Sequence, residues 1–293
     1  MIELVLTAAG AQRVRFAVSP LEEALGAVRV ALGVRDHPTH LPWLADHAGH
    51  TVHDLEIPEL ASVLGAPRYI TDFLSPPPEG PRTTAEAQFA AIRHTPPDQV
   101  AAELALVDAD LGPLPDDPAR ARDLLADQLE LAWTTLVAPH WPRIHQVLLA
   151  DIEHRSTRLA EGGLRAALAG IHPRVRPGER AVLVDIAARE RVELDERGLL
   201  LLPSVFAWPQ LGVITMPPWQ PALVYPARGA AAVWEYDRPA PAALAAVVGR
   251  TKAALLAALV RPSRRPRPSW PTGWGSRPAR CRSTSPRCAR RDC

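Results

Sequence analysis

The spacing of hydrophobic residues predicts that the first half of the chain is mainly helical. At Ser19-Pro20-Leu21-Glu22, a capping serine, a first-turn proline and an early acid favour the start of a helix. Hydrophobic residues then recur at helical spacing as far as Leu32, and a proline-rich loop is predicted around Ser75–Pro78. Further helices are predicted over Ala85–Arg93, Asp98–Leu111, Ala119–Val137 and, with an irregularity at Gly162-Gly163, over Pro139–Ala169.

The period changes after His172-Pro173, where short hydrophobic runs are separated by glycine, proline and charged turns. Such runs are typical of strands. We expect an α+β fold in which a mainly helical half is followed by an antiparallel β-meander. The predicted strands are Ile2–Thr7, Ala181–Ile186, Arg191–Leu194, Gly198–Phe206, Gly212–Met216 and Ala222–Tyr225.

One uncharged stretch, Gly198–Ala227, is hydrophobic enough to resemble a membrane span. Six prolines interrupt it, and each removes a backbone donor that lipid cannot replace. We therefore expect no membrane segment there. Ile2 and Glu3 follow Met1 in place of a basic, hydrophobic leader, so we also expect no secretory signal and a cytoplasmic protein.

The C-terminal residues differ sharply from the rest. Helical spacing returns over Pro241–Val260, but residues 261–293 contain six prolines, ten arginines and no Leu, Ile or Val, so they are expected to be disordered. We divide the chain into a regulatory α+β domain (1–240), the first helix of a truncated domain (241–260) and a disordered tail (261–293).

Charge and cysteine follow the same division. Ten of the 33 basic residues but one of the 32 acidic residues lie in 261–293, so the tail has a net charge of +9 and the remainder −8. An acidic body is unsuited to grip phosphate backbones unaided. All three cysteines, Cys281, Cys288 and Cys293, lie in the tail without the paired spacing of a zinc module, so we expect free thiols.

Several long strings give the chain a family resemblance. It resembles actinobacterial ArsR-type winged-helix transcriptional regulators that carry a long N-terminal domain of uncharacterised function, over roughly residues 1–260. In that family a helix-turn-helix would follow Gly249-Arg250-Thr251-Lys252. The strings are Ser19-Pro20-Leu21, His37-Pro38, Leu41-Pro42-Trp43, Tyr69–Pro78, Ala138–Ile144, Arg158–Gly163, Leu201–Pro209, Pro218–Pro221 and Tyr225–Gly229.

The expected helix-turn-helix is absent in the reading frame of the protein, yet the genetic code indicates it in another. If each codon starts at the third base of the codon shown, Trp270-Pro271 forces Ala, Trp274-Gly275 forces Gly and Asp292-Cys293 forces Leu. With GC-rich codons, the stretch from about Arg267 then reads Thr-Glu-Leu-Ala, a Pro-Gly turn and a Ser-Gln-His-Leu recognition helix. We interpret the tail as the product of a frameshift that removed the DNA-reading helices.

The resemblance implies a DNA-binding regulator that acts as a homodimer on promoter DNA, with a possible small-molecule effector and no cofactor. In this form it would be defective in sequence-specific binding. A stand-alone ligand-binding or protein-interaction module without DNA binding is the alternative, and an enzyme with an unrecognised site is a third. No enzymatic motif is visible: Ser204 lacks a Gly-x-Ser-x-Gly surround, and there is no glycine-rich phosphate loop.

The sequence evidence for a ligand-binding site is weaker than the family resemblance. A pocket for an apolar ligand could be lined by tryptophans, although core packing explains each of them equally well. His37, His40, His47, His50 and His53 are expected on a solvated loop and helix surface more than at a metal, and His140, His145, Asp151, Glu153 and His154 in ordinary structural roles. The pocket candidates are Trp133, Trp141, Trp208, Trp219 and Trp234.

The frameshift interpretation makes a prediction about the gene. The alternative frame should remain open beyond the codon for Cys293 and encode the wing of a winged helix. Nucleotide sequencing across the codons for 255–293 and downstream of them checks this. A stop codon soon after the decoded helix-turn-helix would contradict it.

Overall fold

The computed structural model describes residues 1–45, 54–66, 69–80, 83–234, 246–249 and 252. Met1–Asp237 forms one compact unit and Arg238–Cys293 another. Residues 246–248 are helical. Gly249 is not helical and has a φ of +82°, so the predicted helix over 241–260 is interrupted there, whereas Lys252 is helical again. The other residues of that helix, and the predicted disorder of the tail, lie outside the described residues.

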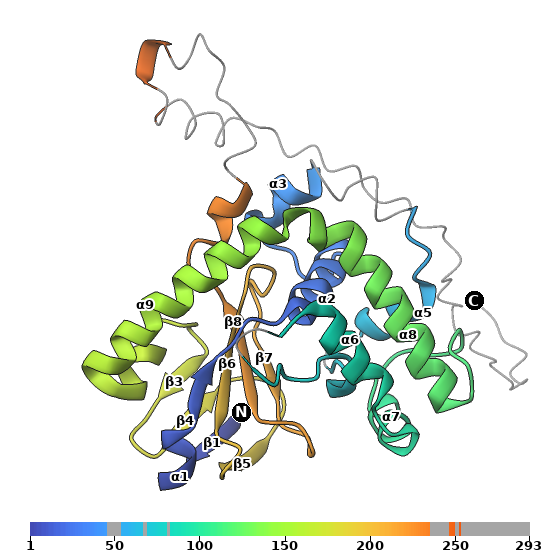
Figure 1. The fold of residues 1–293 in the computed structure, drawn as a ribbon, viewed down its shortest axis with the longest axis horizontal. Coiled ribbons are helices and arrows are strands. Elements are labelled where there is room, and N and C mark those ends of the chain that lie inside the picture. Colours follow the sequence, from blue (N-terminus) through green and yellow to red (C-terminus); the bar gives the residue numbers. More distant parts are fainter. Residues whose placement is uncertain (46–53, 67–68, 81–82, 235–245, 250–251, 253–293) are drawn as a thin grey trace, which may run out of the picture. The chain divides into compact units, whose positions relative to one another are not determined.

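Two four-stranded sheets lie in the first unit (Figure 1). One has the order β3-β4-β1-β5, in which β1 (Ile2–Leu6) pairs antiparallel with β4 (Ala181–Val184) and parallel with β5 (Glu190–Leu194). The other has the order β2-β6-β8-β7, with β2, β6 and β8 parallel and β7 antiparallel. The remaining bounds are β2 Val14–Phe16, β3 Val175–Pro177, β6 Leu199–Ser204, β7 Gly212–Ile214 and β8 Ala222–Pro226.

The α+β class and the helical first half are confirmed, whereas the antiparallel meander is wrong because both sheets are mixed. Hydrophobic period shows which residues form strands but not which strand lies beside which. Two of the three parallel pairs join β1 and β2 to strands almost two hundred residues later in the chain, and the third joins β6 to β8. Such long crossovers leave no local signal.

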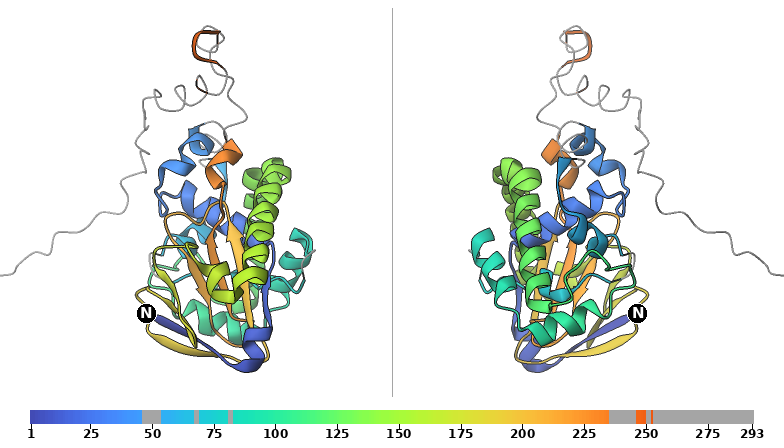
Figure 2. Two further views of the ribbon diagram at one scale, coloured as in Figure 1. Left: turned by 90° about the vertical axis from the view of Figure 1, so that its left-hand side faces the viewer. Right: turned by 90° about the vertical axis from the view of Figure 1, so that its right-hand side faces the viewer.

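Strand β6 explains how the sheets are held. Every residue of β6 is buried, as its continuous run of leucines suggests. Leu199 and Leu201 pack with β1, β4 and β5 in a core between the sheets, whereas Leu200 and Leu202 pack with β7 and β8 on the other face. Figure 2 shows the sheets and the helices from the side.

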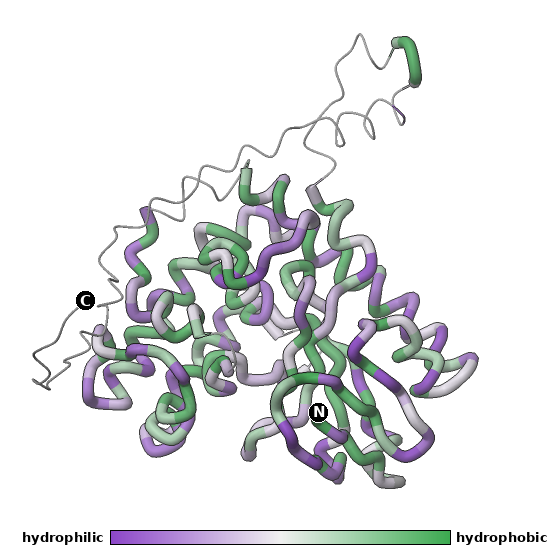
Figure 3. The backbone as a smooth tube through the Cα atoms, turned by 180° about the vertical axis from the view of Figure 1, so that it is seen from behind, coloured by the Kyte–Doolittle hydropathy of each residue, from purple (hydrophilic) through white to green (hydrophobic). Residues whose placement is uncertain are grey.

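The helices form the largest hydrophobic core, and they gather beside the strands in Figure 1. Hydrophobic and hydrophilic residues alternate along the tube in Figure 3. The predicted helix over Asp98–Leu111 ends early, at Leu104. The bounds are α1 Ala8–Gln12, α2 Pro20–Ala31, η1 Pro38–His40, α3 Leu41–Trp43, α5 Pro58–Leu64, η3 Asp72–Leu74, α6 Ala85–Arg93, α7 Pro97–Leu104, α8 Pro118–Ala132, η4 Trp133–Val137, η5 Ala138–His140, α9 Trp141–Leu168 and η6 Ala230–Trp234.

Helix α9 is joined to the end of β8 by a buried polar network. Asp151 accepts hydrogen bonds from the Tyr225 hydroxyl (2.8 Å), Arg155 Nε (3.0 Å) and the backbone N–H of Arg228 (3.0 Å). Arg155 also lies 4.8 Å from the centre of the Tyr225 ring and donates to the Ala167 carbonyl. The helix bends at the predicted irregularity, where Gly163 has a φ of +67°.

No helix among the described residues is long and apolar enough to cross a membrane. The uncharged stretch Gly198–Ala227 contains β6, β7 and β8, so its hydrophobic residues pack between and beside sheets.

The network predicts that Asp151→Ala destabilises the protein strongly. The variant leaves the buried Arg155 guanidinium without its carboxylate, which costs about 3–5 kcal/mol of unfolding free energy. Urea unfolding measures this. Glu153→Ala, at an exposed position on the same helix, is the control and should change stability by less than about 0.5 kcal/mol. Similar losses for both variants would show that the network does not hold α9.

Candidate functional site

The described residues form two surface hollows, one of about 540 Å³ lined by five residues near the N-terminus and a groove of about 500 Å³ lined by fifteen, among them a tryptophan and five prolines. Three segments build the groove: the loop Pro76–Glu79, the wall formed by α6, residues 94–96 and the start of α7, and the turn between β7 and β8. Pro76, Pro77, Pro78, Pro96 and Pro218 supply saturated rings to the wall, and Trp219 supplies an indole.

Gln88 fixes the α6 side of the groove. Its side chain is buried, and its amide oxygen accepts a hydrogen bond from the backbone N–H of Leu21, in the first turn of α2. The amide nitrogen donates to the Pro76 carbonyl (3.0 Å) and to the Ser19 hydroxyl (3.0 Å). One side chain therefore joins the groove wall, the proline loop and the N-terminus of the buried helix α2.

Glu103 fixes the opposite side. Its carboxylate is fully buried and accepts hydrogen bonds from the indole N–H of Trp219 (3.3 Å) and the amide of Gln99 (2.9 Å) on one oxygen. The other oxygen accepts the backbone N–H of Phe73 (2.6 Å). The carboxylate therefore holds Trp219 and Gln99, both of which line the groove.

A second buried carboxylate, Asp72, lies beside Glu103. Burial, followed by repulsion from Glu103, raises the pKa of Asp72 to about 7, against hydrogen bonds from Met216 and Thr215 that lower it. Met216 N–H donates to Asp72 at 3.3 Å. The interior behind Trp219 is therefore acidic.

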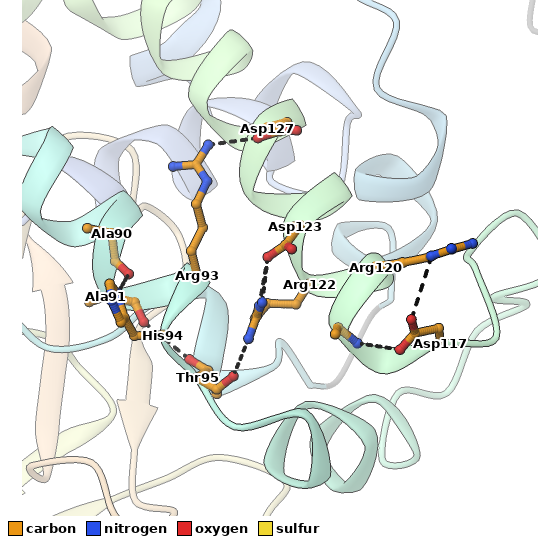
Figure 4. Close-up of polar contacts among 11 residues, drawn as sticks. Ala90, Ala91, Arg93, His94, Thr95, Asp117, Arg120, Arg122, Asp123 and Asp127 are labelled. Atoms are coloured by element: carbon orange, nitrogen blue, oxygen red, sulfur yellow. Dashed lines mark hydrogen bonds and ion pairs between the residues drawn. The ribbon is translucent and has the colours of Figure 1, made fainter.

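The arginines next to the groove are paired with acids of their own (Figure 4). Arg93 lies 2.7 Å from both Asp127 and Glu130 on α8, and these hydrogen bonds raise its pKa. Arg122 pairs with Asp123 at 2.8 Å and donates to the backbone carbonyl of Thr95. Their positive charge is therefore largely offset.

The five predicted pocket tryptophans do not all line this groove; among them only Trp219 does. Trp133 packs edge-on against Trp141, with ring centres 5.0 Å apart. Trp208 stacks on His37 at 5.4 Å, and Trp234 lies within 6.3 Å of Trp43 and 5.9 Å of Phe206.

The histidine prediction needs one correction. His40 is fully buried and its Nε2 contacts the Trp208 carbonyl at 2.9 Å, so it is not on a solvated surface. Phe206 stacks against its ring, which explains the burial. His47, His50 and His53 lie outside the described residues. Within the described ranges, no group of three His, Cys, Asp or Glu side chains is placed to hold a metal.

Glu103, Gln99 and Asp72 were not predicted from the sequence. The sequence predicts the proline loop and contains the Pro218–Pro221 string, but it does not indicate that the two segments lie close together. No motif connects them, because α6, α7 and the β7–β8 turn meet only through the tertiary fold.

Comparison with protein families gives one match, in the second half of the body. Residues 111–231 match the model DUF5937, described as a family of unknown function. The match covers α8, α9, β3 to β8 and Trp219, but neither α6 nor the proline loop. Comparison with curated proteins gives no match, and comparison with solved structures gives none.

Asp72→Asn tests the acidic interior. An ordinary aspartate has a pKa of 3.8 and buried Asp72 about 7, so the folded protein binds an extra proton between these values. Stability should therefore fall as pH rises through this range, by up to about 1.4 kcal/mol per pH unit. Asparagine can still accept from Met216 but does not titrate, so the part of this loss that comes from Asp72 should disappear, whereas the part from buried Glu23, whose pKa is raised to about 8, should remain.

Urea unfolding at about pH 5 and about pH 7 measures the difference. Asp108→Asn, which removes an exposed carboxylate nearby, is the control and should keep the wild-type pH dependence. Identical pH dependence in wild type and Asp72→Asn would contradict the raised pKa.

Proposed function

We propose that the chain is a transcriptional regulator of the ArsR winged-helix type whose body, Met1–Asp237, is a sensing domain for a small molecule. The intact protein would bind promoter DNA as a homodimer in the cytoplasm. The proposal is one of binding, not of catalysis.

The proposal is supported by the separation along the chain of a ligand-binding part from a DNA-binding part. A compact unit with its own binding groove ends at Asp237, and the first helix of the winged-helix domain is predicted from residue 241. Two strings of the family resemblance, Tyr69–Pro78 and Pro218–Pro221, contribute to the wall of the groove. A sensing domain needs such a site, and a regulator needs the DNA-reading helices that the alternative frame encodes.

Electrostatics support the same division. The body, residues 1–237, has 20 basic and 31 acidic residues and so a net charge of −11; it therefore repels phosphates, and DNA binding falls to the C-terminal segment. Direct readout requires a helix whose side chains reach the base edges, and the reading frame of this chain does not encode one. The protein in this form is therefore proposed to be disabled in sequence-specific binding.

A stand-alone ligand-binding or protein-interaction module is the second candidate. The groove favours it, because all the contacts that shape the groove lie within Met1–Asp237 and none requires DNA.

A gel-shift comparison tests the regulator. A frame-restored protein should bind the DNA upstream of its own gene about a thousandfold more tightly than random duplex at about 150 mM salt. The protein in its present reading frame should bind both DNAs weakly and equally, and this binding should fall steeply as salt rises, because only its arginine-rich tail attracts phosphate.

Truncation after Val260 is the control and should abolish the residual binding. If the protein in its present reading frame selects its own upstream DNA as well as the restored form does, the account of a disabled regulator is wrong. If the restored form shows no selection while the body binds a ligand, the stand-alone module is correct.

A further inference from the structure

We propose that the groove binds an organic cation: a ligand with an apolar ring and an amine. This inference names the effector class of the proposed sensing domain and rests on that function for its regulatory meaning.

The walls suit a ring. Five prolines and Trp219 surround about 500 Å³, a volume within the usual range for small-molecule sites. Ala87, Ala90 and Ala91 keep the α6 wall shallow, because their side chains do not extend into the space. The flat apolar ring of a ligand can therefore pack against this wall and be removed from water.

The charges suit a cation. Among the described residues that line the groove there is a carboxylate, Glu79, and no lysine or arginine. The indole of Trp219 donates to the buried Glu103 carboxylate, which makes its ring a better partner for positive charge. Arg93 and Arg122, the neighbouring guanidiniums, are already bound to acids.

The hydrogen-bonding groups suit an amine. The side-chain N–H of Gln99 donates a hydrogen bond to Glu103, and the amide oxygen of Gln99 remains as an acceptor. His94 Nδ1 lies 2.6 Å from the Ala90 carbonyl and must donate to it, so Nε2 of the neutral ring is also an acceptor. Acceptors on the wall require donors on the ligand.

Three probes with one ring system separate charge from shape: naphthylmethylammonium, naphthylmethanol and naphthoate. Calorimetric titration of the full chain should show the ammonium binding about tenfold more tightly than the alcohol, and naphthoate more weakly still. Equal affinity for ammonium and naphthoate, or no ammonium binding at millimolar concentration, would overturn the proposal.

Variants locate the site. Ala87 is exposed on α6 and lines the groove, so Ala87→Arg should fold normally and weaken ammonium binding about tenfold or more, whereas Ala87→Glu should strengthen it. Trp219→Leu should also weaken it about tenfold. Trp133→Leu removes a half-buried tryptophan outside the groove and should leave it unchanged.

Unchanged affinity in both Ala87→Arg and Trp219→Leu would place the ligand elsewhere and refute the proposal. The outcome is independent of the gel shift: the ammonium can bind although the restored protein fails to select DNA, which refutes only the regulator. DNA selection without ammonium binding refutes only this inference.

Discussion

Burial of helix α2 is the constraint on which the rest of the body depends. Almost the whole helix is buried, including three of its charged side chains. Burial raises the pKa of Glu22 and Glu23, that of Glu23 to about 8. Because a buried ionisable group is costly without a hydrogen-bond partner, each one fixes a neighbouring segment. Glu22 binds the Ser75 hydroxyl, and Glu23 accepts the N–H of Val205 after β6. Arg29 donates to the carbonyls of Leu64, the last residue of α5, and of Ala66.

These contacts bring together loops that are far apart in the sequence. Gly26 permits the close approach, since a Cβ there would lie 2.7 Å from the Phe206 side chain. The segment that Glu22 fixes leads directly into the proline wall of the groove, and Gln88 joins that wall to the start of α2. The polar contacts that stabilise the buried helix α2 therefore also shape the groove.

The sequence predicted individual helices and strands better than it predicted which segments lie in contact in the fold. Ser19 and Pro20 predicted the start of α2, the glycine pair predicted the irregularity in α9, and the hydrophobic run from Gly198 to Phe206 predicted the strand β6, because each signal lies within a few residues. The parallel pairing of β1 with β5 and the joining of Trp219 to Glu103 depend on contacts more than a hundred residues apart. Of the tryptophans, side-chain type alone could not distinguish Trp219 from those packed in clusters.

Hydrogen exchange of the full chain, with and without naphthylmethylammonium, tests the central claim most directly, because it locates a ligand without any substitution. A cation in the groove should slow exchange of the backbone amides that the walls carry: those of Glu79 and Gly80, of the non-proline residues in 87–99, and of Met216 and Trp219. Protection confined to the region of Trp133 and Trp141, or no protection at a saturating concentration, would contradict the assignment of this groove as the binding site of the body.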